Sequence, residues 1–400
     1  MRVTQERPLT RDDPASGIME TCDVLFVGGG PAGSTCAWKL RRRGFEVIVL
    51  DKQLYPRDKI CAGWITPQVM IELGLSADEY RRHGVIQPFN RFLTGLIGGP
   101  TVETRYDHVV SYGIRRAEFD TFLLHHSTAE LRLGESLNSL HRKNDFWIAN
   151  GSIQAKVVVG AGGPHCPVAT QFRRVQSADE TGIAQPQEHQ PTILTQEIEF
   201  EMSPRQLRDC PVFRDRPELY FCPDLKGYGW VVRKENFLNI GLGRENDSDL
   251  SNRVSEFIRV LVADGRIPSD LPGHFHGHVY RLNRGFNEQP WEPNLLLVGD
   301  AAGLADTHSA EGIRPAIESG ILAAETIIEA RALRSDNLVS PYTDRLRQRF
   351  EVPNKSSIGD WIPSALRLSA ARWLMRSSAF SRRVVLDKWF LHLGQPPLKI

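Results

Sequence analysis

The residues with the clearest chemical meaning are three glycines in the pattern G-x-G-x-x-G, at Gly28, Gly30 and Gly33. An apolar run, residues 24–27, precedes them and a helix-like stretch follows. This order predicts a strand, a turn and a helix that bind a dinucleotide. Gly28 would make the turn, Gly30 would let the backbone approach a pyrophosphate, and Gly33 would let the helix pack on the strand.

A carboxylate lies where a dinucleotide fold needs one. A second strand-like run, residues 46–51, ends on Asp51 and is followed by Lys52, and both residues are expected to contact the cofactor. Asp51 is expected to accept a hydrogen bond from the adenosine ribose, and its charge disfavours a 2′-phosphate. FAD or NAD therefore fits better than NADP. The pyrophosphate is expected at the N-terminus of the first helix, beside Pro31 and Ala32, where the helix dipole favours negative charge.

Two later segments decide between FAD and NAD. The segment "AKVVVGAGG" (155–163) predicts another strand, which contains Gly160, and "NLLLVGDAAG" (294–303) predicts a buried strand followed by a Gly-Asp turn. A long amphipathic helix is expected to start near Gly312. In FAD proteins with this layout the aspartate, here Asp300, bonds the ribityl chain. The helix N-terminus carries roughly +0.5 of a charge and stabilises the anion that develops on the reduced flavin. The cofactor contacts expected in these segments are Gly160, Gly299, Asp300, Ala301, Gly303, Gly312 and Ile313.

At these residues the chain resembles the geranylgeranyl reductase family, which comprises FAD proteins with the p-hydroxybenzoate hydroxylase-type fold. The likeness covers about residues 22–335. The segment "YPRDKICAGWITPQ" (55–68) is similar to the family's P-R-D-K-x-C-G segment, and "RAEFD" (116–120) is similar to its R-x-x-F-D. The resemblance implies FAD contacts at Arg57, Cys61, Ala62 and Arg116.

The same resemblance implies a substrate site on a later strand. The segment "GYGWVVRKENFLNIGLG" (227–243) is similar to the family's G-Y-x-W segment followed by G-x-G, which is associated with an isoprenoid-binding cavity. Tyr228 and Trp230 would line that cavity, and their alternation along one strand places both rings on one side. An ordinary core face remains the alternative for these two rings.

Two residues are candidates for proton chemistry at the flavin. Cys61 follows the second strand on a loop that, in the resembled family, runs near the isoalloxazine ring, so its thiol could donate a proton or gate the ring. His308 lies between the Gly-Asp turn and the helix that faces the flavin, so it could act as a general acid. The alternatives are a small buried apolar residue for Cys61 and a local hydrogen bond for His308. We expect no metal site.

The function that follows is an FAD-dependent oxidoreductase that reduces carbon–carbon double bonds of an isoprenoid or other apolar substrate by hydride transfer from reduced flavin. NAD(P)H or a redox protein would supply the electrons. One alternative is an FAD-dependent monooxygenase that uses NAD(P)H and oxygen, and another is a non-catalytic FAD-binding or lipid-binding protein. The W-x-W-x-I-P motif expected of flavin-dependent halogenases is missing, since the chain reads "GYGWVVRK" at 227–234.

The predicted fold class is α/β (α+β), with a Rossmann-like FAD-binding domain, an inserted antiparallel β-sheet domain for substrate and a C-terminal helical region. The order of strand-like and helix-like stretches predicts these boundaries. The FAD-binding domain is expected at 21–90, 106–175 and 286–335, the substrate domain at 91–105 and 176–285, the C-terminal helices at 336–400, and a loose tail at 1–20.

Composition sets the remaining expectations. The 400 residues are 41% hydrophobic with a formal net charge of +1, which gives no global reason to expect nucleic-acid binding. The first twenty residues lack the apolar region of a signal peptide, and six cysteines occur without C-x-x-C pairing. Both features favour a cytoplasmic protein with reduced thiols.

The C-terminal region has a different character. From Trp361 onward seven Arg or Lys residues oppose one Asp, and tryptophans accompany them. Basic amphipathic helices with tryptophan can lie on an anionic membrane surface, so a peripheral membrane contact is one interpretation. The other interpretation is a helical cap over the substrate cavity.

Overall fold

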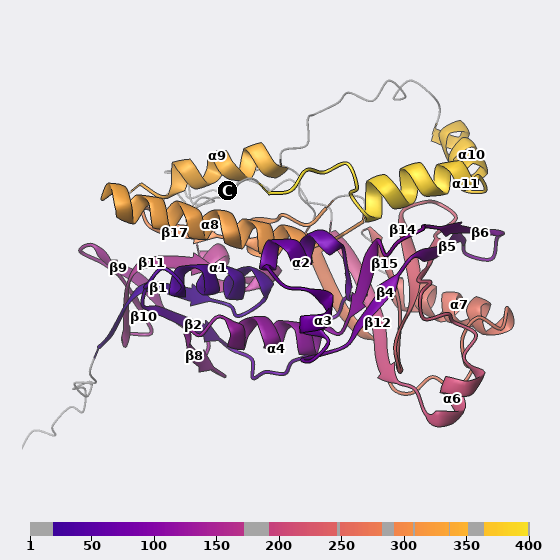
Figure 1. Ribbon diagram of the computed structural model, residues 1–400, viewed down its shortest axis with the longest axis horizontal. Coiled ribbons are helices and arrows are strands. Elements are labelled where there is room, and N and C mark those ends of the chain that lie inside the picture. The colour runs from indigo at the N-terminus through magenta and orange to yellow at the C-terminus, as the bar shows by residue number, and fades with distance from the viewer. Residues whose placement is uncertain are drawn as a thin grey trace, which may run out of the picture.

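The computed structural model describes residues 19–171, 192–245, 249–281, 292–306, 309–335, 337–350 and 364–398. Figure 1 shows two sheet-based halves side by side along the longest axis, with α8 and α9 above the first half and α10 and α11 above the second. Within the described residues no helix combines the length and apolar character needed to cross a membrane.

The first half is built on a mainly parallel sheet in the order β8-β2-β1-β11-β10-β9, with β17 also paired to β11. Strands β1, β2, β8, β11 and β17 run parallel, whereas β9 and β10 form an antiparallel edge. Its strands are β1 (Glu20–Val27), β2 (Val47–Asp51), β8 (Glu130–Leu133), β9 (Leu140–Lys143), β10 (Phe146–Ala149), β11 (Ile153–Gly160) and β17 (Leu295–Leu297).

The parallel strands are continuous apolar runs because helices cover them. Val24, Leu25 and Phe26 of β1 are fully buried, as are Val158 and Val159 of β11. Such runs are typical of parallel sheets with both faces covered. The helices of this half are α1 (Pro31–Arg41), α2 (Pro67–Leu73), α3 (Ala77–Tyr80), α4 (Arg116–His126), α8 (Ile313–Leu333) and α9 (Val339–Phe350).

The second half is built on a large sheet in the order β16-β12-β15-β14-β13-β5-β6. All neighbours are antiparallel except β13 and β5, which run parallel. Its strands are β5 (Arg91–Leu96), β6 (Thr101–Arg105), β12 (Thr192–Glu201), β13 (Glu218–Phe221), β14 (Gly227–Lys234), β15 (Phe237–Glu245) and β16 (His276–Arg281). A small sheet in the order β3-β7-β4 lies beside it and comprises β3 (Trp64–Ile65), β4 (Ile86–Phe89) and β7 (Ser111–Ile114).

The two faces of the large sheet have different neighbours. One face packs under α7 (Leu250–Ala263) around a core that includes Val231, Ile240 and Phe257. The other face carries Tyr228, Trp230 and further aromatic side chains, which pack against the C-terminal segment. The remaining elements are α6 (Pro204–Asp209), α10 (Ser364–Leu374), α11 (Ser378–Phe380), the 3-10 turns η1 (Gly163–His165) and η2 (Gly299–Ala302), and the π-helix η3 (Ser381–Phe390).

Candidate FAD site

A cavity of about 1140 Å³ lies at the carboxyl ends of the parallel strands. This is the edge at which open α/β sheets bind their ligands. The three sequence segments with glycine-rich turns meet here, because β1 leads into Gly28, β11 into Ala161 and β17 into Gly299. The cavity also reaches the large sheet, where Gly277 and His278 of β16 line it.

Gly28 lies at the sharpest turn in this wall. Its φ is +118°, and a Cβ added there would lie 2.4 Å from the carbonyl of Ala161. Gly33 has a packing role, since a Cβ there would lie 2.1 Å from the Gly28 carbonyl oxygen. Both positions therefore exclude side chains so that α1 and β11 can approach the turn.

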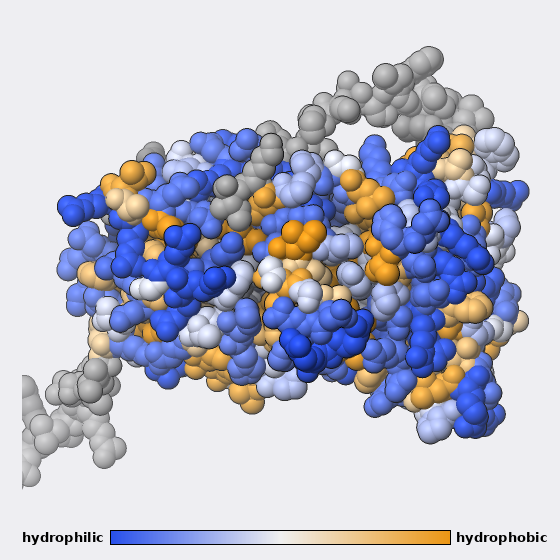
Figure 2. All heavy atoms as spheres, in the orientation of Figure 1, coloured by the Kyte–Doolittle hydropathy of each residue, from blue (hydrophilic) through white to orange (hydrophobic). Residues whose placement is uncertain are grey.

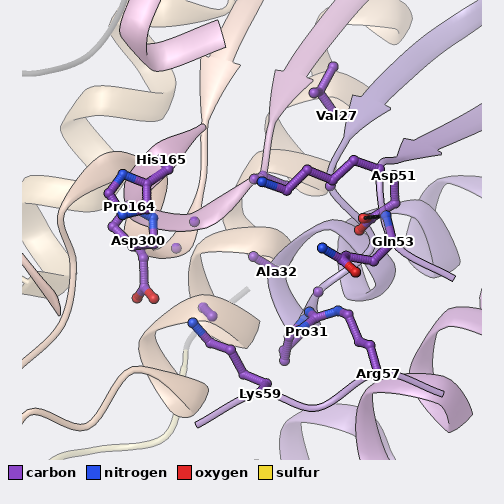
Figure 3. Close-up of a pocket in the computed structure, with 18 of the residues that line it drawn as sticks. Val27, Pro31, Ala32, Asp51, Gln53, Arg57, Lys59, Pro164, His165 and Asp300 are labelled. Carbon is purple, nitrogen blue, oxygen red and sulfur yellow. Dashed lines mark hydrogen bonds between the residues drawn. The ribbon is translucent and has the colours of Figure 1, made fainter. Parts of the chain in front are cut away.

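Asp51 connects the end of β2 to the glycine turn. Its Oδ2 accepts hydrogen bonds from the Gly29 N–H at 2.7 Å and the Tyr55 hydroxyl at 3.0 Å, and its Oδ1 accepts one from the Gln53 N–H at 2.9 Å. Figure 3 shows Asp51, Gln53 and Arg57 on one side of the cavity and His165 and Asp300 on the other. The two carboxylates therefore lie at opposite ends of an elongated site.

Two helices begin at this cavity without a side-chain cap. The residue before α1 is Gly30 and the residue before α8 is Gly312, and no side chain caps either helix. Both glycines line the cavity. The free N–H groups of a first helical turn favour an anion or a group that becomes anionic. A long molecule with negative charge at two separate places therefore fits the site.

Basic side chains line the cavity between these ends. Arg57 donates to Asp120 at 3.1 Å, and the buried Arg116 donates to both oxygens of the same carboxylate at 2.9 and 2.8 Å. Burial lowers the pKa of Arg116, but the charge of Asp120 more than offsets this effect and the pKa stays above its ordinary value. Arg116 is thus a permanent cation beside Cys61.

Lys59 and His278 form a second basic contact, with Nζ and Nε2 separated by 2.6 Å. Burial, followed by the charge of Lys59, lowers the pKa of His278 to about 3, so this ring is neutral at pH 7 and can accept a hydrogen bond. Burial lowers the pKa of Lys59, whereas the charge of Asp300 raises it. In Figure 3 Lys59 points toward the side of the cavity that holds Asp300.

The loop after β17 joins the cavity to the other half of the molecule. Ala310 lines the cavity with a φ of +54°, and the carbonyl of Ser309 accepts a hydrogen bond from the Tyr228 hydroxyl at 2.5 Å. Glu311 lies 3.1 Å from Nε2 of His392, which follows η3. The structure therefore connects the start of α8 to the large sheet and to the C-terminal segment.

Most of the residues predicted to contact FAD come together in this one cavity. Those that line it are Gly28, Gly30, Pro31, Ala32, Asp51, Lys52, Arg57, Cys61, Arg116, Gly299, Asp300, Gly312 and Ile313. Gly33, Ala62, Gly160, Ala301 and Gly303 lie beside it without lining it. His308 lies outside the described residues.

Tyr228 and Trp230 lie behind the cavity in a cluster of aromatic side chains. Their ring centroids are 6.1 Å apart, and the Tyr228 ring is 5.2 Å from that of Phe390 in η3. Trp64 stacks on Phe390 at 5.5 Å and on Phe92 at 5.4 Å. We call Trp64, Phe92, Tyr228, Trp230 and Phe390 the aromatic cluster.

Three polar residues of this region were not predicted from the sequence: Lys59, Glu197 and His278. Lys59 is part of the quoted 55–68 segment, and its charge was the available signal. Glu197 and His278 are isolated polar residues in strand-like runs, and only the strand pairing Thr195 with His278 brings them to the same face.

Comparison with known proteins agrees with this geometry. A family model described as an NAD(P)-binding Rossmann-like domain matches residues 27–57. Digeranylgeranylglycerophospholipid reductase of Methanocaldococcus jannaschii is 24% identical, with 83% of this chain and 84% of the relative covered. Menaquinone reductase of Mycobacterium tuberculosis is 27% identical, with 79% and 78% covered. A solved geranylgeranyl bacteriochlorophyll reductase-like protein of Thermoplasma acidophilum has a TM-score of 0.68 at 22% identity, with 89% and 88% covered.

The fold and the site define an FAD-dependent oxidoreductase with a Rossmann-like domain, which confirms the predicted fold class. Within that class the chain resembles the geranylgeranyl reductase family, as the 55–68 and 116–120 segments predicted.

Proposed function

We propose that this protein reduces carbon–carbon double bonds of an isoprenoid or other apolar lipid, with FAD in the cavity described above. The observation that carries the proposal is the path of the loop from Cys61 to Trp64. Cys61 lines the FAD cavity, whereas Ala62 and Trp64 pack into the aromatic cluster. A short loop therefore separates a dinucleotide site from a buried aromatic region whose side chains suit an apolar chain.

The cofactor contacts in this proposal follow the geometry of the cavity. The glycine turn and the N-terminus of α1 bind the pyrophosphate, Asp51 binds the adenosine ribose, and Asp300 binds the ribityl chain. Arg57 and Arg116 place positive charge along the site. The N-terminus of α8, beside Gly312 and Ile313, favours the extra negative charge of the reduced ring system.

When bound and reduced, FAD would supply the hydride for one alkene carbon, and an acid would supply the proton for the other, so that the substrate gains two electrons and two hydrogens. NAD(P)H or a redox protein returns the two electrons. We assign Cys61 to the proton chemistry because its partly exposed side chain lines the cavity beside Arg116. Tyr228 and Trp230 bind the apolar chain of the substrate, and the loop that holds Ser309 and Ala310 keeps water from the reacting atoms.

The names of two relatives support this substrate class, since they specify a digeranylgeranylglycerophospholipid and menaquinone. Both names denote reduction of molecules that carry an isoprenoid chain. An aromatic cluster with no charged member suits such a chain better than a polar metabolite.

The test is an anaerobic stopped-flow experiment on the flavin-loaded protein. The flavin is reduced chemically, a geranylgeranyl-bearing lipid is added, and absorbance in the oxidised flavin band is followed. We expect reoxidation without oxygen, together with a saturated product, and no reoxidation by the matching phytanyl lipid. If the flavin stays reduced until air is admitted and an oxygenated product then appears, the protein is a monooxygenase. If neither acceptor yields product, a non-catalytic FAD-binding or lipid-binding protein replaces the proposal.

A further inference from the structure

A buried carboxyl lies directly behind the Cys61 loop. Glu197 is on β12, on the face of the large sheet that carries Trp230, and is only 5% exposed. A Cβ at Gly241, its cross-strand partner, would lie 2.8 Å from the Glu197 Cβ, so a glycine opposite makes room for this side chain. Glu197 has no part in the cavity wall, so the contacts assigned to FAD leave it unexplained.

Side chains of the large sheet bind both the N–H and the carbonyl group of Cys61. Its N–H donates to Oε1 of Glu197 at 2.6 Å, and its carbonyl accepts from Nδ2 of Asn239 at 3.3 Å. Asn239 is itself fixed, because its Oδ1 accepts from the Trp230 ring N–H at 2.7 Å. These bonds determine where the Cys61 thiol lies along the cavity wall.

The other oxygen of Glu197 is an exception among buried polar atoms. Oε2 is buried and has no hydrogen-bond partner among the described residues. The nearby cation, Lys234, donates instead to Glu199 at 2.5 Å, and Arg115 lies 3.6 Å from the other oxygen of Glu199. Glu197 thus lacks the close positive partner that a buried carboxylate ordinarily requires.

We propose that Glu197 is a positioning residue for Cys61, holding the thiol at the flavin when ionised and loosening the loop when protonated. The inference rests on the role proposed above for Cys61. A charged acceptor forms a hydrogen bond about twice as strong as a neutral one, so protonation weakens the bond to the Cys61 N–H. A proton bound at Oε2 finds no acceptor among the described residues, so protonation weakens one bond of Glu197 without forming another.

Glu197 is expected to change its protonation state near neutral pH. Burial raises its pKa to about 7, although the Cys61 N–H and the charge of Lys234 oppose the rise. The other charged or titratable groups that face it are Glu199 on β12, Lys234 on β14 and His276 and His278 on β16, and the Cys61 loop covers it. Glu199 is paired with Lys234, and His278 is neutral at pH 7. The Glu197→Gln variant separates a step that belongs to Glu197 from one that belongs to His276 or to the Cys61 thiol.

The experiment measures alkylation of Cys61 by iodoacetamide in the FAD-loaded protein between pH 5.5 and 9, by peptide mass spectrometry. Cys210, also partly exposed but in the other half, gives an internal reference in the same digest. We expect the Cys61 rate, relative to Cys210, to change several-fold through a step near pH 7. The step should vanish in Glu197→Gln and persist in Glu201→Gln, an exposed carboxyl four residues along the same strand.

Three outcomes overturn the inference: no step in the native protein, a step that survives Glu197→Gln, or a step lost in Glu201→Gln. The native protein alone provides a test if Glu197→Gln does not fold. Alkylation requires no substrate, so it tests the positioning role separately from the proposed function. A pH step that depends on Glu197, found in a protein that reduces no alkene, would contradict the proposed function and support the positioning role. In turnover, Glu197→Gln should lower kcat several-fold at pH 8 without changing KM, and should respond less to pH than the native enzyme.

Discussion

Gly28 shows how strictly one residue of the site is determined. A side chain at φ +118° is strained, and a Cβ would also meet the Ala161 backbone at 2.4 Å. The strain alone is on the order of 1–3 kcal/mol, and the overlap adds to it. We expect Gly28→Ala to lower the thermal midpoint and to purify largely without flavin, which the ratio of absorbance at 450 and 280 nm measures.

A matched control separates strain from overlap. Gly151 has a φ of +69° in a surface turn, and a Cβ there would meet nothing within 4 Å. Gly151→Ala should therefore show a small stability loss with full flavin content. Equal flavin contents in the two variants would contradict the role given to the glycine turn.

Glu197 gives a second prediction at this scale, with a definite sign. Its pKa is about 7 in the folded protein against a reference value of 4.5, so between these values the folded state binds more protons than the unfolded state. Stability therefore falls as pH rises from 4.5 to 7, by on the order of 3 kcal/mol. Glu197→Gln has no such titration, so its thermal midpoint relative to the native protein should rise across this range. A constant difference at pH 5, 6, 7 and 8 would show that the group does not titrate there.

Strand ends explain how much of the site the sequence could predict. Gly28, Asp51 and Asp300 lie beside the ends of apolar runs, and parallel strands bring such ends to one edge of a sheet, so local pattern is sufficient to place them. The roles of Glu197 and His278 depend on the pairing of β12 with β15 and β16. This pairing brings two residues that are far apart in the sequence to the face that the Cys61 loop covers. Periodicity fixes which face a residue occupies but not which loop covers that face.

The C-terminal segment, η3 and the residues after it, contacts the site through side chains that no local sequence pattern pairs. Phe390 of η3 packs on Tyr228, whereas the predicted cap over a substrate cavity and the predicted membrane contact both stay proposals. Further anchors are the hydrogen bond of Tyr106 to Asp387 at 2.6 Å and the contact of His392 with Glu311 at 3.1 Å.

The His392 contact makes the docking of this element sensitive to pH. Burial disfavours the charged ring, but the close carboxylate of Glu311 outweighs this effect and raises the pKa of His392 above 6.5. The contact of His392 with Glu311 therefore stabilises the docked C-terminal segment fully below pH 6.5. This stabilisation is lost as the pH rises through the folded-state pKa of His392. We expect trypsin to cleave within 382–388 a few times faster at pH 8.5 than at pH 6, after correction for trypsin activity on an unfolded substrate.

His392→Asn should remove most of this pH dependence, whereas His141→Asn, at an exposed position on β9, should retain it. If both variants keep the native pH response, the ion pair does not hold the C-terminal segment. Peptide mapping of the first cleavage products distinguishes these cases.

At the scale of the whole molecule, the FAD cavity is where separate parts of the chain meet. Its lining comes from β1 and α1, the 51–61 loop, Arg116, the turn after β11, β16 and the start of α8. Figure 2 shows polar and charged side chains across most of the visible face, with apolar groups scattered among them. The first and second sheets each have a core of their own, and two further apolar clusters join the small sheet to helices of the first half and the aromatic face of the large sheet to the C-terminal segment. A ligand in the cavity therefore adds contacts between parts that have cores of their own.

FAD should for this reason stabilise together the separate segments that line the cavity, and not one loop alone. A ligand at 100 times its dissociation constant contributes about 2.7 kcal/mol, which for a 400-residue chain corresponds to a thermal midpoint about 3 °C higher. Removal of FAD should lower the midpoint by at least this amount and increase amide hydrogen exchange together at 28–34, at 57–63 and at 309–316. Added FAD should reverse both effects, whereas exchange in α7, which packs on the far face of the large sheet, should stay unchanged. Faster exchange confined to the glycine turn would mean that the cofactor orders only its pyrophosphate site, and the coupling of the two halves through the cavity would then be wrong.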